Sequence, residues 1–327
     1  AGVQGNVVIY HLIQRLKDID ICGEIILVPN CNPIGTNIKA GEYTLGRFDP
    51  VNGTNWNRGY FFDKGAVEHF AKTVTREESI DGIKQRFRAH LSNAIDNKLA
   101  EPWGLGLAQQ LNLKLQQMAV NADFVLDLHN GPVSTRHVYI PEYAKDSAKL
   151  FNIPHCIFIP NVFAGALDEA TFCPWWTFQE SIKSNLEREI SFNVEAFTLE
   201  MGSQEVIDFN EGNIDATSIL SYLNAKGVLH ECDIKPKAMQ RLSVYLKDYK
   251  TLFTNWGGMV EYMAKPGQTV KKGEPLAQIL NIDDLDTDNG SRTLEAPCDL
   301  IPILHFPSAS VLSGTQLYKV FTNYMEL

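Results

Sequence analysis

The chain has 327 residues, of which 44% are hydrophobic and 21% are charged, as in a globular protein that can bury a sizeable core. The length suggests one large domain, or one large and one small domain. A formal net charge of -10 argues against nucleic-acid binding, which needs a basic face, and no apolar run approaches the roughly 20 residues of a membrane helix. Six scattered cysteines without a CxxC pair favour reduced thiols in a cytoplasmic protein.

The first 240 residues alternate between helical and strand-like segments. Apolar residues at helical spacing predict a helix over 6–16, and the continuous apolar run at 24–33, closed by Asn-Pro, predicts a buried strand that leaves into a loop. The stretch 35–65 is rich in Gly, Asn and Asp and predicts an ordered functional loop, whereas 66–120 is mostly helical. Further strands are predicted at 122–128 and at the runs HVYIP, HCIFIP and AFTLEMG. This alternation indicates an α/β domain with a largely parallel sheet.

The pattern changes at about residue 245, where short strand-like runs are punctuated by Gly and Pro. Two halves of this region repeat the motif V-x-x-G-x-x-L, first at Val270, Gly273 and Leu276 and then at Val311, Gly314 and Leu317. The repeat predicts a small pseudo-symmetric β-sandwich or barrel over 245–327, after an α/β domain over 1–240. It resembles the barrel-sandwich fold of biotinyl and lipoyl carriers. The link NIDDLDTDNGSR lacks their modified-lysine hairpin, so we expect a structural or lid role instead.

His129 ends the apolar run FVLDLHNGP and is the first candidate for chemistry. A single histidine is more often an ordinary polar residue than a metal ligand. This one, however, stands where a buried strand ends, which is the usual place for a site in an α/β sheet. Asp127 lies two residues earlier, and Asn-Gly-Pro turns the chain away. A neutral imidazole here would suit zinc, although one histidine does not make a zinc site.

Three further candidates lie in the loop RFDPVNGTNWNRGYFFD, and one lies in FTLEMGS. Arg47, Asn57 and Arg58 are either ordinary surface residues or donors for a substrate carboxylate or an oxyanion, since guanidinium groups offer forked donors. Glu200 directly follows an apolar strand, where a carboxylate is costly unless it is paired or functional. From this motif alone, Glu200 could with equal weight be an exposed acid at a strand end or a general base.

Taken together, GEIILVPNCNP, RFDPVNGTNWNR, DLHNGP and TLEMG resemble the succinylglutamate desuccinylase/aspartoacylase family, relatives of the zinc carboxypeptidases. The resemblance spans nearly the whole chain. It implies an α/β/α sandwich with a mostly parallel mixed sheet, followed by a small C-terminal all-β barrel-sandwich domain. It also implies a deacylase with one Zn²⁺ per subunit, which cleaves an amide or ester bond of an N-acyl amino acid or a similar small carboxylated substrate.

The resemblance further implies a role for each candidate residue. His129 would be the third zinc ligand, and Glu200 would be the general base for a metal-activated water. Asn57 and Arg58 would hold the substrate carboxylate, while Arg47 would polarise the scissile carbonyl.

The start of the chain departs from the family, whose first two zinc ligands come from H-G-x-E-x-x-G. If GVQGNV replaces that motif, Gln4 and Val7 occupy the ligand positions. If Gly5 is instead the last glycine of the motif, the glutamate falls on Gly2 and the histidine lies before Ala1. The spacing from Gly5 to the glycine before the next strand favours the second alignment. We therefore expect this chain to lack its N-terminal strand, to hold no complete zinc site and to be inactive alone.

Two other functions remain open. A metal-free binding protein could keep Arg47, Asn57 and Arg58 for a small anionic ligand. A carboxypeptidase acting on peptides would need an open cleft, and the C-terminal β-domain argues against one because in the resembling family it narrows access to the site. A homo-oligomer is expected on general grounds.

Overall fold

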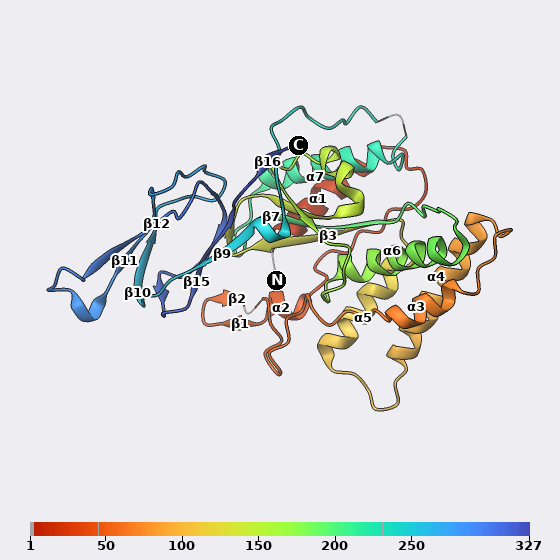
Figure 1. Ribbon diagram of the computed structural model, residues 1–327, viewed down its shortest axis with the longest axis horizontal. Coiled ribbons are helices and arrows are strands. Elements are labelled where there is room, and N and C mark those ends of the chain that lie inside the picture. The colour runs from red at the N-terminus through yellow and green to blue at the C-terminus, as the bar shows by residue number, and fades with distance from the viewer. Residues whose placement is uncertain (1–2, 45, 231) are drawn as a thin grey trace.

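The computed structural model describes residues 3–44, 46–230 and 232–327 (Figure 1). Its larger part is a mixed sheet of six strands with helices on both faces, and its smaller part consists of two four-stranded antiparallel sheets. The predicted class, an α/β part followed by small β-sheets, is confirmed. The helices of the larger part are α1 (Gln4–Leu16), α2 (Pro33–Asn37), α3 (Lys64–Ala71), α4 (Ile80–Leu99), α5 (Leu107–Ala119), α6 (Leu167–Leu186) and α7 (Phe209–Ala225).

The six-stranded sheet has the order β16-β8-β6-β5-β7-β3. Its strands are β3 (Phe124–Gly131), β5 (His137–Pro141), β6 (His155–Ile159), β7 (Glu195–Ser203), β8 (Leu242–Tyr245) and β16 (Met325–Glu326). β3 runs parallel to β7, whereas β5 runs antiparallel to β7 and parallel to β6. The carboxyl ends of β3 and β7 and the amino end of β5 therefore meet at one edge of the sheet.

Helices cover both faces because each presents one apolar side to the sheet. α1 packs beside α7 on one face, where Val8 and Leu12, one helical turn apart, join the main core. α3, α4 and α6 pack together on the opposite side, and the rings of Phe87 and Phe178 stack there with centroids 3.9 Å apart. The three helices α3, α4 and α5 occupy the stretch that was predicted to be mostly helical.

The predicted strand over 24–33 is wrong. The apolar stretch 24–28 is extended, but it pairs with no strand of the described chain, and α2 begins at Pro33. Ile25 and Leu27 still pack against the main core, as their apolar character predicted, whereas Ile26 is 60% exposed. The segment lacks a neighbouring strand, and without one an apolar run cannot form a ladder.

The smaller part contains the predicted internal repeat. Its sheets have the orders β12-β11-β10-β14 and β4-β13-β15-β9. Their strands are β4 (Val133–Ser134), β9 (Tyr249–Phe253), β10 (Gly258–Tyr262), β11 (Pro275–Leu280), β12 (Ser291–Glu295), β13 (Ile301–His305), β14 (Ser310–Val311) and β15 (Gln316–Phe321). Gly273 and Gly314 share a φ of +84°, which favours glycine, and each precedes a strand that carries a fully buried leucine.

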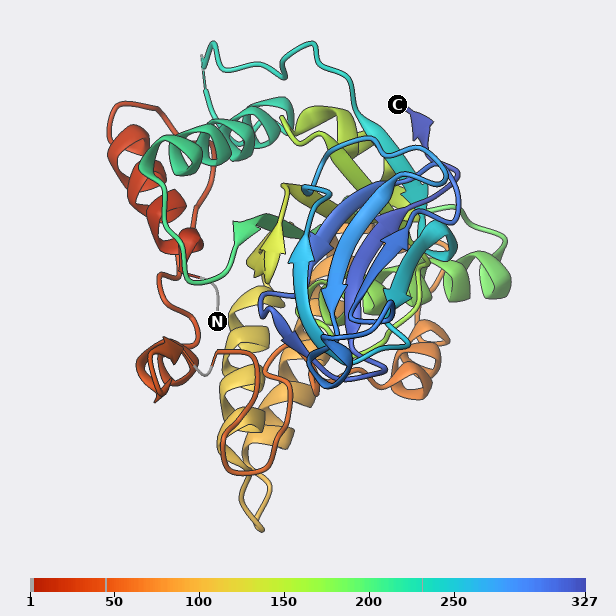
Figure 2. The ribbon, with the colours of Figure 1, turned by 90° about the vertical axis from the view of Figure 1, so that its left-hand side faces the viewer.

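At the junction, each part of the chain contributes one strand to a sheet of the other part. β4, which follows β3 closely, pairs with β13 of the smaller part, and β16 returns from the smaller part to pair with β8. In Figure 2 the strands of the smaller part lie in front of the six-stranded sheet. Across the described ranges, the helices all fall short of the length and apolarity that a bilayer crossing requires.

Candidate functional site

One cavity of about 1120 Å³ brings the five predicted site residues together. It extends along the whole of β3, since every residue of Phe124–Gly131 lines it. His129 and Glu200 line it from these strands, and Arg47, Asn57 and Arg58 line it from the loop that precedes α3. The residues come from three separate segments of the sequence, so the fold is what assembles them.

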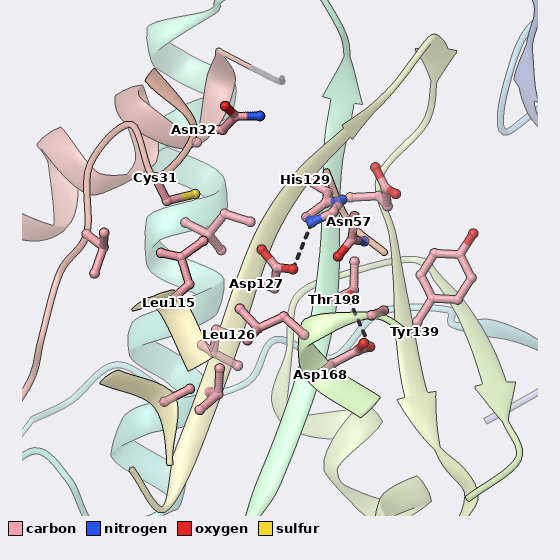
Figure 3. A pocket seen from close by; sticks show the side chains of 18 of the residues that line it. Cys31, Asn32, Asn57, Leu115, Leu126, Asp127, His129, Tyr139, Asp168 and Thr198 are labelled. Atoms are coloured by element: carbon pink, nitrogen blue, oxygen red, sulfur yellow. Dashed lines mark hydrogen bonds and ion pairs between the residues drawn. The ribbon is translucent and has the colours of Figure 1, made fainter. Parts of the chain in front are cut away.

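His129 lies near the end of β3, directly opposite Glu200 of β7 in the parallel register. Its Nε2 lies 2.8 Å from Oδ2 of Asp127, since residues two apart in a strand share a face (Figure 3). Burial disfavours the charged imidazolium, but the carboxylates of Asp127, Glu200 and Asp168 together outweigh burial, with Asp127 contributing most, and raise the pKa of His129 to about 9. The side chain is 25% exposed and can therefore be reached from the cavity.

Glu200 lies at the centre of the meeting strands, opposite His129 on one side and His137 on the other. Its Oε2 atom is buried and has no hydrogen-bond partner in the described part of the chain. A buried carboxylate oxygen without a partner is costly, and in a native protein such an atom marks a site that another group completes. Burial lowers the pKa of the neighbouring His137, against the opposing effect of the Glu200 carboxylate.

The loop that carries the arginines is ordered, as predicted, through its own hydrogen bonds. The Trp56 amide donates to the Arg47 carbonyl at 3.1 Å, and the Asp49 amide donates to the Thr54 carbonyl at 2.7 Å. The Asn112 side chain of α5 donates to the Arg58 carbonyl at 2.7 Å and ties the loop to that helix. Both arginine side chains stay largely exposed at the cavity and form no ion pair with the described residues.

Lys319 of β15 is a cavity residue that sequence reasoning missed. Its Nζ lies 5.2 Å from the centre of the Tyr249 ring, and it has neither an ion pair nor a hydrogen bond within the described chain. Burial lowers the pKa of Lys319, the Arg47 guanidinium lowers it further, and the Glu200 carboxylate opposes them. The smaller part thus adds a third cation to the cavity. A lone lysine in a β-strand gives no sequence signal for such a role.

Asp168 and Thr198 form a second polar pair beneath His129 (Figure 3). The Thr198 hydroxyl donates to Asp168 Oδ2 at 2.9 Å, and the Glu169 amide donates to Asp168 Oδ1 at 2.8 Å. Burial raises the pKa of Asp168 to about 6, and the nearby Asp127 carboxylate adds to the effect. These partners hold the carboxyl in place at the amino end of α6.

The described residues do not by themselves form a zinc site. Residues 3–44, 46–230 and 232–327 contain no group of three His, Cys, Asp or Glu side chains placed to hold a metal ion. Gln4 is buried and bonds the backbone of Asp208 through its side chain, and Val7 is a core residue, so neither replaces a ligand. Only His129 stands where the resemblance places a ligand, and Gly2 lies outside the described residues.

Comparisons with known proteins place the chain in one family. The family model described as the succinylglutamate desuccinylase/aspartoacylase catalytic domain matches residues 2–225. A succinylglutamate desuccinylase/aspartoacylase family protein of Shewanella amazonensis SB2B has a similar solved structure, with 45% identity over 100% of this chain and 89% of that chain and a TM-score of 0.96. A structure from Shewanella frigidimarina NCIMB 400, which carries the same succinylglutamate desuccinylase/aspartoacylase name, is 44% identical over 99% of this chain and 87% of that chain, also with a TM-score of 0.96.

More distant structures share the fold alone. A succinylglutamate desuccinylase/aspartoacylase of Rhodobacter sphaeroides is 16% identical, with a TM-score of 0.63 over 100% of this chain and 82% of that chain. A comparison with curated proteins yields no match.

Proposed function

Because the chain belongs to the succinylglutamate desuccinylase/aspartoacylase family, we propose that its parent protein is a zinc-dependent deacylase that hydrolyses an amide or ester bond of an N-acyl amino acid or a similar small carboxylated substrate. The observation that carries the proposal is the convergence of His129, Glu200, Arg47, Asn57 and Arg58 on one cavity.

The chemistry assigned to these residues follows from their charge and position. Glu200 accepts a proton from the attacking water, because its unpartnered buried oxygen needs a hydrogen-bond donor. Arg47 polarises the scissile carbonyl, and Asn57 and Arg58 hold the substrate carboxylate. Lys319 faces the same space, and we assign it to the anionic part of the substrate as well.

We further propose one zinc ion per subunit, with His129 as one protein ligand. A zinc ion at this position would supply a Lewis acid for the attacking water. The other two ligands would come from outside the described residues.

The experiment is hydrolysis of a panel of N-acyl amino acids by the protein with its native upstream residues. Glu200→Gln keeps the size of the side chain and removes the base, so we expect kcat to fall by about 100-fold or more with a smaller change in KM. Glu261→Gln, on the exposed surface of β10, serves as the control and should leave both constants unchanged. Equal kcat values for the Glu200 variant and the parent would contradict the assigned role.

A metal-free binding protein for a small anion is the second candidate. Three cations at the cavity without an ion pair in the described chain, together with the incomplete ligand set, favour it over a carboxypeptidase. It predicts tight binding of carboxylates by a protein that takes up no zinc and turns over no substrate.

A further inference from the structure

A row of polar side chains crosses the middle of the six-stranded sheet. The strands β3, β7, β5 and β6 each contribute one residue to it, in the order His129, Glu200, His137 and His155. Residues that lie opposite each other in neighbouring strands project from the same face of a sheet. The smaller part covers this face at His137, because the ring of Tyr249 from β9 lies there with its centroid 6.4 Å from that of the imidazole.

The hydrogen bond of His137 determines which of its ring nitrogens carries the proton. Nδ1 lies 2.9 Å from the carbonyl oxygen of Thr135, which can only accept, so Nδ1 is the donor. The side chain is fully buried, and burial lowers its pKa, which keeps the ring neutral. Nε2 is then an acceptor, and it has no hydrogen-bond partner among residues 3–44, 46–230 and 232–327.

Two further buried atoms without a partner belong to the side chains next to His137. They are Oε2 of Glu200, which lies opposite His137 in the register of β5 and β7, and the hydroxyl oxygen of Tyr249. Burial raises the pKa of the Tyr249 hydroxyl, and the nearby side chains of Tyr139 and Glu200 add to the effect. Tyr249 therefore keeps its proton and is a hydrogen-bond donor, whereas Oε2 and Nε2 are both acceptors.

One water molecule matches this set of two acceptors and one donor. Two acceptors cannot bond each other, but a water can donate one hydrogen to Glu200 Oε2 and the other to His137 Nε2. It can also accept a hydrogen bond from the Tyr249 hydroxyl. Buried waters typically form about three hydrogen bonds to polar groups that would otherwise lack a partner.

We propose that His137 is a positioning residue for Glu200 and that it acts through one ordered water shared with Tyr249. The inference rests on the proposed function, in which Glu200 is the general base. By holding Oε2, the water fixes the orientation of the carboxylate towards the cavity. A carboxylate has about four acceptor positions, so it can bind this water and the attacking water at the same time. The ordered water is therefore distinct from the water that attacks the substrate.

Two substitutions of His137 separate positioning from a merely structural role. His137→Leu removes the acceptor, and we expect kcat to fall by about 10- to 100-fold with little change in KM. His137→Gln offers an amide oxygen in its place and should recover most of the loss. Tyr262→Phe, which removes a tyrosine hydroxyl outside the cavity, serves as the control and should leave both constants unchanged. An unchanged kcat in His137→Leu, or equal losses in the two His137 variants, would overturn the proposal.

A double substitution tests whether His137 and Tyr249 share one water. Tyr249→Phe removes only the hydroxyl and should lower kcat in the same direction as His137→Leu. If one water serves both residues, the variant that carries both substitutions should lose little more than His137→Leu alone. Losses that multiply in the double variant would contradict a shared water.

Nitrogen NMR of the protein carrying isotope-labelled histidine tests the contact without any turnover. We expect a neutral His137 with its proton on Nδ1, and an Nε2 resonance that moves in both Tyr249→Phe and Glu200→Gln. The resonances of His69 on α3 should not move in either variant. A proton on Nε2, or an Nε2 resonance that neither substitution moves, would overturn the proposal even in an active deacylase. The expected shifts in a protein that hydrolyses no substrate would contradict the proposed function and still support the shared water.

Discussion

Lys319 shows how one side chain from a distant strand can set the specificity of the cavity. Its ammonium is half-buried, lies against Tyr249 and forms no ion pair with the described residues, although the Glu200 carboxylate acts on it, so an anionic group of a substrate could bind there. We predict that Lys319→Met raises KM for a substrate with a carboxylated acyl group by about 10- to 100-fold, since hydrogen bonds to charged groups contribute about 1.5–3 kcal/mol. The kcat value should change less.

Two controls make this prediction specific. Lys250→Met, on the neighbouring strand β9, removes an exposed ammonium outside the cavity and should leave KM unchanged. A substrate with an uncharged acyl group should not distinguish Lys319→Met from the parent. If the Lys319 variant binds both substrates as the parent does, Lys319 has no part in recognition.

The buried imidazole of His155 makes the stability of the fold depend on pH. The residue is 6% exposed, and burial, with His137 nearby, lowers its pKa from 6.5 to about 4. Because the unfolded chain takes up the proton first, the stability that the neutral form provides is present above pH 6.5 and is lost as the pH falls towards 4. The loss is on the order of 3 kcal/mol.

We therefore predict that His155→Gln weakens the dependence of stability on pH in this window. Urea unfolding at pH 7 and pH 5 measures it, and the difference in unfolding free energy between the two pH values should be smaller in the variant. His69→Gln, on the surface of α3, should keep the dependence of the parent. The same slope in all three proteins would exclude His155 as the source.

At the level of secondary structure, the sequence was informative wherever a segment carries its own pattern. The run FVLDLHNGP predicts a strand over 122–128, and β3 covers most of that range but continues to Gly131, three residues past the predicted end. The repeated glycine turns of the smaller part were visible because each glycine adopts a positive φ ahead of a strand. The helical stretch after residue 65 was also recognisable from its composition.

Features that depend on contacts between distant segments of the chain could not be predicted from local sequence patterns. The run over 24–33 has the composition of a buried strand, but a strand exists only with a neighbour, and the described chain offers none at that place. Lys319 gives no local signal, because its role depends on β15 lying beside the loop of Arg47. The role of His129 as a zinc ligand remains a prediction, as do the roles of Glu200, Asn57 and Arg58.

At the scale of the whole molecule, the smaller part completes the cavity. β4 connects β3 to the sheet that contains β15, and β16 ties the end of the chain back to β8. These exchanged strands fix the position of Lys319 relative to His129 and Glu200. The smaller part therefore forms one wall of the cavity, through Leu304, Gln316 and Lys319.

Zinc content tests the central claim most directly. Elemental analysis would be performed on the native protein and on its His129→Ala variant. Our account predicts close to one zinc per chain in the native protein and little in the variant, which lacks one protein ligand. A native protein that takes up no zinc even when it is supplied would contradict the deacylase proposal and favour a metal-free binding protein for small anions.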